Sequence, residues 1–333
     1  MTTTFKILLL ICLIASTING QVDDLWKHYK QQFGKEYLDG NVDLERKVQF
    51  TKSLEHITSH NEKFKNGTVS YDLGLNHYSD WTKTEVDNLN KPMPVMAPIR
   101  KPTRLPQNGY VVPTLRLPQS VDWRKQGYVT PVKDQKSCGN SYIFSAIGAL
   151  EGQMAKATGK LVALSEQNVM DCNNANLGCF GGDVKNVYEF IQSQNGIVKE
   201  KSYPYQGMRE VCHFNRNNVA ARVKGLFWIK SGDEAALQSA IATQGPVSIS
   251  FDDKHPSFIH YKSGIYNPPN CRKNFPGRAA LIVGYGTCPK TFQEYYIVKN
   301  SMGCNFGMNG YFLLARNKNN ACGVASSVTW PKV

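Results

Sequence analysis

The sequence lacks several features that mark particular classes of protein. It has no low-complexity tract, no Cys-x-x-Cys pair and no run of five basic residues. The absence of a low-complexity tract argues against a disordered or fibrous chain. The absence of a Cys-x-x-Cys pair argues against a zinc site. We expect no metal or other cofactor. The absence of a run of basic residues gives no reason to expect a nucleic-acid partner. What remains is a globular chain of 333 residues, 41% hydrophobic, which is long enough for a substantial core.

Long apolar runs are equally scarce, because only residues 5–18 (FKILLLICLIASTI) form one. This run is short, lies at the N-terminus and has Lys6 at its front. We predict a signal peptide over residues 1–20 and entry into the secretory pathway, with an extracellular or lysosomal destination. A signal anchor is the alternative. No later segment is long enough to be a membrane span.

Acidic residues are outnumbered, and the formal net charge is +13. After residue 112 there are 25 Lys and Arg against 14 Asp and Glu, so most of the excess lies in the larger C-terminal part. Such an excess favours acidic surfaces such as glycosaminoglycans or anionic lipid. Because the basic residues are scattered, we prefer a basic surface without a specific partner.

Nine cysteines fit a secreted chain. Cys12 falls inside the predicted signal peptide, which leaves an even set of eight in an oxidising route. Their number alone does not give the pairing.

Residues 21–112 begin with two helical patterns. Apolar residues recur every three or four positions, first at Trp26, Tyr29, Phe33 and Tyr37 and then at Phe50, Leu54 and Ile57. Asn66-Gly67-Thr68 is an N-glycosylation sequon. The stretch from Lys91 to Thr114 is rich in Pro and basic residues without periodicity, and it is typical of a linker open to proteolytic maturation.

The centre of the sequence is the stretch Gln135–Ser145 (QKSCGNSYIFS). An apolar stripe follows Ser141 at helical spacing, at Ile143, Ile147, Leu150 and Met154, which predicts a buried helix that starts at Ser141. After about residue 220 the pattern changes to short alternating or apolar runs broken by Gly and Asn, which are typical of strands.

This central stretch resembles the active-site signature of papain-like cysteine peptidases, with Ser141 where that family has its nucleophilic Cys. Leu117–Gln135 resembles the start of a mature cathepsin L-like domain. The spacing of Arg46, Phe50, Ile57 and Asn61 resembles the ERFNIN helix of cathepsin L-like propeptides, with Val42 and Ser53 at its Glu and Asn positions. The run Gly74, Asn76, Tyr78, Asp80 resembles a second propeptide motif.

The resemblance implies an α+β fold of two lobes, one helical and one built on a β-sheet, with a cleft between them. It implies a propeptide over residues 21–112 and a monomeric papain-like domain over residues 113–333, with peptide or protein ligands in its cleft. Gly181, Gly182, Asp183 and Val184 would border the substrate cleft. A helix cap is an equally good interpretation of Asp183.

The resemblance also implies three disulfides, namely Cys138–Cys179, Cys172–Cys212 and Cys271–Cys322. Cys288 and Cys304 lie outside this scheme. We favour an extra bridge between them, and two free thiols are the alternative.

The family's catalytic positions correspond to Gln135, Ser141, Arg278 and Asn300, with Arg278 where the family has its His. A hydroxyl needs a general base, and a helix N-terminus contributes only about 0.3–2 kcal/mol toward ionising it. A guanidinium stays protonated and cannot accept the proton. His213, His255 and His260 are the only histidines after residue 112, and none occupies a catalytic position. We therefore expect no peptidase activity.

Three functions remain open at this point. The first is a secreted or lysosomal protein that binds peptides or proteins in its cleft, including cystatin-like inhibitors or active cathepsins. Here Arg278 would hold a carboxylate, or it would lie exposed over the cleft wall and bind nothing. The second is a hydrolase that uses Ser141 with an unassigned base, and the third is a storage or structural protein.

Overall fold

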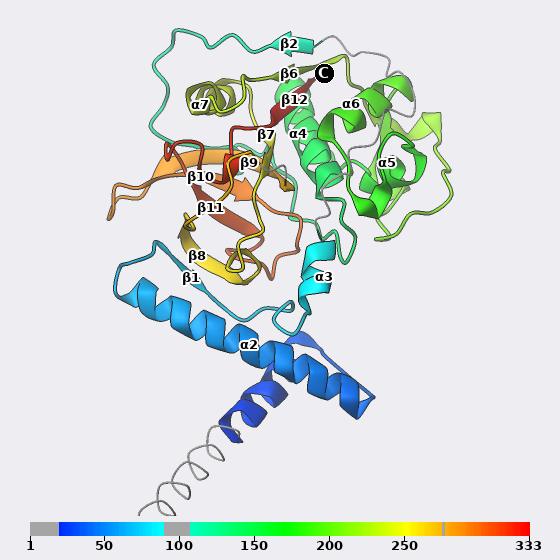
Figure 1. Ribbon diagram of the computed structural model, residues 1–333. Coiled ribbons are helices and arrows are strands. Elements are labelled where there is room, and N and C mark those ends of the chain that lie inside the picture. The colour runs from blue at the N-terminus through cyan, green and yellow to red at the C-terminus, as the bar shows by residue number, and fades with distance from the viewer. Residues whose placement is uncertain (1–19, 90–106, 275–276) are drawn as a thin grey trace, which may run out of the picture.

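The computed structural model describes residues 20–89, 107–274 and 277–333 (Figure 1). The predicted signal peptide lies outside the described residues except for Gly20, and so does most of the predicted linker. Within the described ranges, no helix is both long enough and apolar enough to cross a membrane.

The N-terminal segment, residues 20–89, is mainly helical, as the aromatic spacing predicts. Residues 20–33 form a helix, and it is followed by α2 (Gly40–Lys65), β1 (Tyr71–Leu73) and α3 (Lys83–Asn88). Trp26, Tyr29 and Phe50 are buried together in a small core of their own. α3 begins with a capping box between Thr82 and Glu85, which satisfies backbone donors at its first turn.

A helical lobe follows. It contains the central helix α4 (Ser141–Thr158), α5 (Glu166–Cys172), α6 (Val184–Ser193) and the short 3-10 helices η1 (Gly178–Phe180), η2 (Glu200–Ser202) and η3 (Arg216–Asn218), with a two-stranded sheet of β4 (Ile197–Val198) and β5 (Val219–Ala221). Of the predicted stripe of α4, Ile143, Ile147 and Leu150 have no exposed surface, and Met154 is partly buried against the same core. The helix ends at Gly159, whose left-handed backbone conformation (φ 71°) suits glycine.

The second lobe is a sheet with the strand order β1-β8-β11-β10-β9-β7-β12-β6-β2, and β3 pairs with β9 off this path. Its strands are β2 (Gln107–Gly109), β3 (Val121–Asp122), β6 (Gly225–Trp228), β7 (Val247–Phe251), β8 (Tyr261–Tyr266), β9 (Arg278–Thr287), β10 (Glu294–Lys299), β11 (Tyr311–Ala315) and β12 (Val328–Lys332), accompanied by α7 (Glu234–Thr243), η4 (Phe258–His260) and η5 (Ala321–Gly323). The change from a helical pattern to a strand pattern near residue 220 is confirmed.

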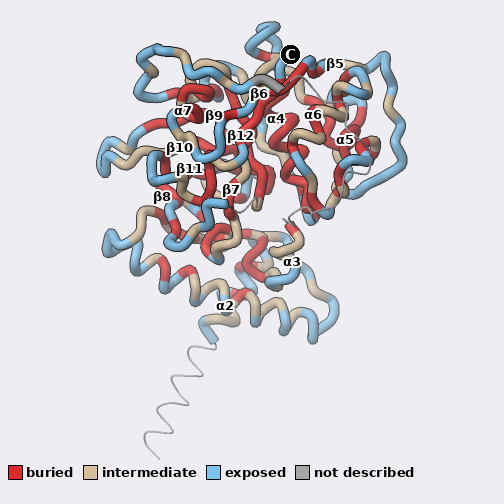
Figure 2. The backbone as a smooth tube through the Cα atoms, turned by 45° about the horizontal axis from the view of Figure 1, so that its top comes forward, coloured by how far each residue is buried: buried red, intermediate tan, exposed pale blue. Residues whose placement is uncertain are grey.

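The two lobes meet along α4, which is buried over most of its length (Figure 2). The Ser145 hydroxyl donates to the Ala280 carbonyl of β9 (2.6 Å) and is 2.6 Å from the Ser248 hydroxyl of β7. Gly148 faces Leu281 of β9 so closely that a Cβ at this position would lie 2.8 Å from the Leu281 side chain. This close packing sets the start of α4 beside the start of β9.

Candidate functional site

Ser141 is the first residue of α4, at the junction of the lobes. Its side chain is nearly buried (5% exposed), and its hydroxyl accepts a hydrogen bond from the backbone amide of Ala279 (3.2 Å). Asn140 before it donates its side-chain amide to the Tyr205 hydroxyl (3.0 Å). The helix start is therefore held against both lobes, with the hydroxyl adjacent to the first residues of β9.

Arg278 starts β9 and is 1% exposed, so the alternative of an exposed guanidinium over the cleft wall is wrong. Its Nη1 donates to Gln135 Oε1 (2.9 Å) and to Asn300 Oδ1 (3.5 Å). Its Nε lies 3.4 Å from the carboxylate Oδ2 of Asp253. Burial lowers the pKa of Arg278 from its ordinary high value, and the carboxylate of Asp253 opposes this shift. The cation is stabilised by groups of the protein itself.

Asp253 was not predicted as a site residue. It follows β7, whose last residue, Phe251, is the register partner of Arg278, and it is nearly buried (side chain 7% exposed). The sequence did contain a signal, because an Arg inside an otherwise apolar run needs a carboxylate when buried. Choosing among the acidic residues required the strand pairing.

Gln135 uses both ends of its side-chain amide in the site. Its Oε1 accepts from Arg278 and from the Ser301 hydroxyl (2.6 Å), while its Nε2 donates to the backbone carbonyls of Cys138 (2.7 Å) and Leu89 (3.1 Å). Leu89 belongs to the N-terminal segment. The amide thus joins the buried cation on one side to a peptide carbonyl of the N-terminal segment on the other.

Asn300 lies next to Gln135 and is also buried. Its Oδ1 accepts from the Ser301 amide (3.0 Å) and from Arg278. Its Nδ2 is buried and has no hydrogen-bond partner among the described residues. The amide oxygen of Asn300 is therefore turned toward the guanidinium of Arg278.

Each of the three histidines in the main domain, which comprises the two lobes after residue 112, has a partner of its own. The His255 ring is hydrogen-bonded to the Ser257 hydroxyl (2.7 Å), and His213 stacks on Tyr203 with ring centroids 3.7 Å apart. His260 is buried and lies 3.4 Å from the hydroxyl of Ser79 in the N-terminal segment. Burial, together with the neighbouring His56, lowers the pKa of His260 to about 4.

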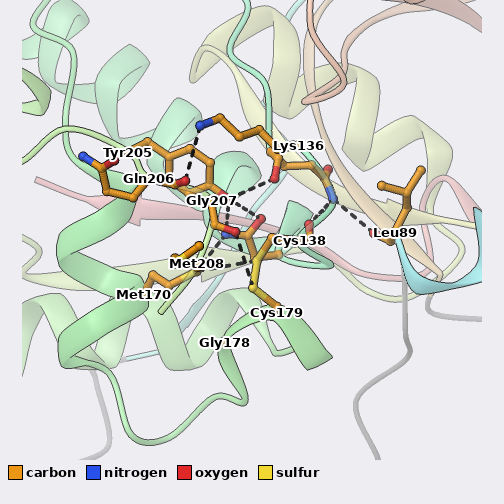
Figure 3. Close-up of a disulfide and its surroundings, with 12 residues drawn as sticks. Leu89, Lys136, Cys138, Met170, Gly178, Cys179, Tyr205, Gln206, Gly207 and Met208 are labelled. Carbon is orange, nitrogen blue, oxygen red and sulfur yellow. Dashed lines mark hydrogen bonds between the residues drawn. A yellow bond between two sulfur atoms is a disulfide. The ribbon is translucent and has the colours of Figure 1, made fainter. Parts of the chain in front are cut away.

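The end of the N-terminal segment passes directly over the start of the helical lobe. At Gly139 a Cβ would lie 2.8 Å from the Asn88 carbonyl oxygen and 2.6 Å from that of Cys179, so only glycine fits. Figure 3 shows Leu89 on one side of the Cys138–Cys179 disulfide and the Tyr205–Met208 loop on the other. A cavity of about 240 Å³ lies between the segment and the main domain, lined by Trp81 and Leu89 on one side and by residues including Phe258 and Arg278 on the other.

The four residues predicted to border the substrate cleft have different surroundings in the structure. Gly182 packs against Tyr142, whose ring would be 2.6 Å from a Cβ there, and Gly181 has a left-handed φ of 104°. Asp183 caps α6, because its side chain accepts from the Lys185 amide (2.8 Å). Val184 is buried with the core of the helical lobe. The structure thus gives Asp183 the capping role.

The three disulfides implied by the resemblance are present, namely Cys138–Cys179, Cys172–Cys212 and Cys271–Cys322. The favoured extra bridge is wrong, because Cys288 and Cys304 are free thiols. Cys288 precedes β10 and Cys304 follows it. A strand of six residues spans about 20 Å, whereas bridged Cα atoms lie within about 7 Å.

The structure shows where the predicted glycosylation site lies but does not test whether it is modified. Asn66 caps the C-terminus of α2 and is exposed, so its side chain is open to glycosylation. The described residues contain no group of three His, Cys, Asp or Glu side chains arranged to hold a metal ion.

Comparisons with known proteins show the family and the fold. A family described as Papain family cysteine protease matches residues 117–332, and one described as Cathepsin propeptide inhibitor domain (I29) matches residues 26–86. Cathepsin S of Bos taurus is 40% identical over 317 residues, covering 94% of this chain and 93% of the bovine protein. Cathepsin L of Sarcophaga peregrina is 41% identical over 319 residues, covering 94% and 93% of the two chains.

Among solved structures, the digestive procathepsin L2 proteinase from the larval midgut of Tenebrio molitor has a TM-score of 0.86 at 37% identity, covering 94% of this chain and 100% of that one. The recombinant stem bromelain precursor has a TM-score of 0.82 at 29% identity, covering 94% and 99%. The chain therefore belongs to the papain family of cysteine proteases and has the papain-like α+β fold preceded by a helical cathepsin propeptide.

Proposed function

We propose that this papain-family chain has no peptidase activity and binds peptides or proteins in its cleft. The observation that carries the proposal is the position of Arg278, whose guanidinium is buried between Gln135, Asn300 and Asp253. The proposal takes Ser141 and Arg278 to occupy the family's nucleophile and base positions.

The chemistry follows from the two side chains. Papain-type hydrolysis needs a nucleophile that loses its proton to a neighbouring base. An unperturbed thiol ionises near pH 8.5 and its neighbours lower that value, whereas a serine hydroxyl depends entirely on the base. Arg278 cannot take up a proton. The hydroxyl proton of Ser141 would therefore have no acceptor during an attack on a carbonyl carbon.

The peptide-binding part of the proposal is supported by the Leu89 contact. Gln135 Nε2 donates to a main-chain carbonyl of the propeptide, which is the kind of contact that any extended peptide offers. Arg278 is neutralised by Asp253, so we do not assign it to an acidic ligand. Ligands of this class include protein inhibitors of active relatives, which the chain would sequester in the secretory pathway, in lysosomes or outside the cell.

The test is turnover of fluorogenic peptides by the processed protein, with Ser141→Ala as the matched control. We expect the wild type and the variant to give the same background rate. Turnover by the wild type that the substitution abolishes would refute inactivity. Labelling of Ser141 by a serine-directed phosphonate would favour a serine hydrolase instead.

A second measurement addresses binding. Gln135→Glu keeps the oxygen that Arg278 and Ser301 use but replaces the donor that faces Leu89 with an acceptor. A lost or unsatisfied buried hydrogen bond costs about 1–3 kcal/mol. We expect a protease to remove the propeptide at least several-fold faster from this variant, and an unchanged rate would argue against peptide binding through Gln135.

A further inference from the structure

The chain between the propeptide and the main domain contains a strand whose position points to a role of its own. β2 pairs in parallel with β6, in the register Gln107 to Leu226 and Gly109 to Trp228. The ladder continues with the Tyr110 amide, which donates to the Trp228 carbonyl (3.0 Å). Figure 1 shows β2 beside β6 at the end of the molecule opposite to α2. The strand is thus remote from the rest of the propeptide.

Tyr110 anchors this strand to the main domain. Its hydroxyl is hydrogen-bonded to the hydroxyls of Ser239 (3.0 Å) and Thr243 (2.8 Å) on α7. Its ring meets Trp330 of β12 edge-on, with centroids 5.3 Å apart. Ser239 and Trp330 are both buried, at 0% and 1% exposed. Tyr110 therefore packs against the core of the main domain and covers it at this point.

The residues that follow make no comparable contact. Val111 is 84% exposed and Leu115 is 65% exposed. Cleavage tends to occur at such exposed segments, yet a cut there would leave the anchored strand attached only by its hydrogen bonds and the Tyr110 side chain.

We propose that residues 107–110 are a permanent edge strand of the main domain and that proteolytic maturation leaves them on it. The processed protein then begins at or before Gln107, or it retains this strand after a nick in residues 111–116. The physical reason is that loss of the strand would bare the backbone edge of β6 and uncover Trp330. This inference places the boundary of the domain earlier than the predicted residue 113 and is independent of whether the cleft is active.

The experiment starts from the secreted full chain, digested with a general protease until the propeptide is gone. Gel filtration under native conditions followed by mass spectrometry identifies the peptides that stay with the domain. We expect residues 107–110 to remain, covalently or as a co-eluting peptide. A stable domain that lacks them and melts at the same temperature as one that retains them would overturn the proposal.

Three variants of the full chain separate anchoring from general stability. Tyr110→Phe keeps the ring on Trp330 and loses only the hydroxyl, Tyr110→Ala loses both, and Val111→Ala alters an exposed neighbour. We expect the strand to be retained after digestion in Val111→Ala, partly lost in Tyr110→Phe and lost in Tyr110→Ala, with melting temperatures falling by several degrees in the same order. If Tyr110→Ala folds and behaves like Val111→Ala, Tyr110 is not the anchor. If Tyr110→Ala does not fold, equal retention in Tyr110→Phe and Val111→Ala contradicts anchoring through the Tyr110 hydroxyl.

Discussion

At the scale of single residues, the site is dominated by one buried charge. Arg278 has almost no exposed surface, and burying a cation is costly unless it is paired and hydrogen-bonded. Gln135, Asn300 and Asp253 together supply that pairing. These three side chains therefore serve to hold a buried guanidinium.

This pairing predicts the effect of removing the acid. Asp253→Asn leaves Arg278 buried without its counter-charge, and breaking a buried pair from one side costs about 3–5 kcal/mol. The melting temperature should fall accordingly. Asp24→Asn is the matched control, because its pair with Lys27 has side chains 72% and 84% exposed, and such surface pairs contribute at most about 1 kcal/mol. Equal effects of the two changes would contradict the role given to Asp253.

If Ser141 and Arg278 occupy the nucleophile and base positions, as proposed, placing Cys and His there should not give full activity. In Ser141→Cys with Arg278→His, we expect the Asp253 carboxylate to compete with Asn300 for the imidazole N–H, because both groups contact the side chain at position 278. We expect weak or no peptide turnover from the double variant. Adding Asp253→Ala should raise turnover by roughly 10-fold or more, since a well-positioned acid–base group contributes about 10²–10⁴. If the double variant is already fully active, the surrounding cleft is intact and Asp253 does not obstruct it.

At the scale of secondary-structure elements, the length of a strand decides whether the cysteines on either side of it can form a disulfide. Cys288 and Cys304 flank the β10 strand, and its extended backbone keeps them apart. Hydrogen bonds from the side chain and, to a smaller extent, from the backbone of Thr291 lower the pKa of the Cys288 thiol.

Alkylation tests this arrangement. Without any reductant, we expect iodoacetamide to modify both Cys288 and Cys304 in the folded protein, as read by peptide mass spectrometry. Thr291→Val should slow the reaction of Cys288 and leave that of Cys304 unchanged, because it removes the hydrogen bond that favours the thiolate. A disulfide-linked peptide containing both cysteines would contradict free thiols.

At the scale of the whole molecule, the propeptide is held against the sheet lobe by pairing of β1 with β8 and by a contact rich in histidine. The His56 ring of α2 lies with its centroid 6.3 Å from that of His260 and 6.4 Å from that of His60. Burial lowers the pKa of His56, and so do His60 and Lys63. Burial also lowers the pKa of His255, with further lowering by His56 and His60 and an opposing effect of Asp252.

This contact predicts release of the propeptide by acid. Histidines with lowered pKa values are neutral in the docked state and bind protons more readily once undocked, so docking is strongest above about pH 6.5 and weakens as the pH falls toward 4. Protease sensitivity of the propeptide, measured from pH 7.5 to 4, should rise in this window. His56→Leu should move the rise to lower pH, whereas the exposed His28→Gln should not. If the protease sensitivity of the propeptide does not change with pH, the histidine contact does not control propeptide release.

The sequence by itself determined the order of the elements, the two lobes, the helix that starts at Ser141 and, through the resemblance, three disulfides. These depend on local periodicity and on motifs that resemble those of a known family. Only the tertiary structure decided that Arg278 is buried, that Asp253 is its partner, that Leu89 binds Gln135 and that Cys288 and Cys304 stay apart. The physical reason is that burial and pairing are set by distances between residues far apart in the chain, and strand register, which fixes those distances, is not written in any single segment.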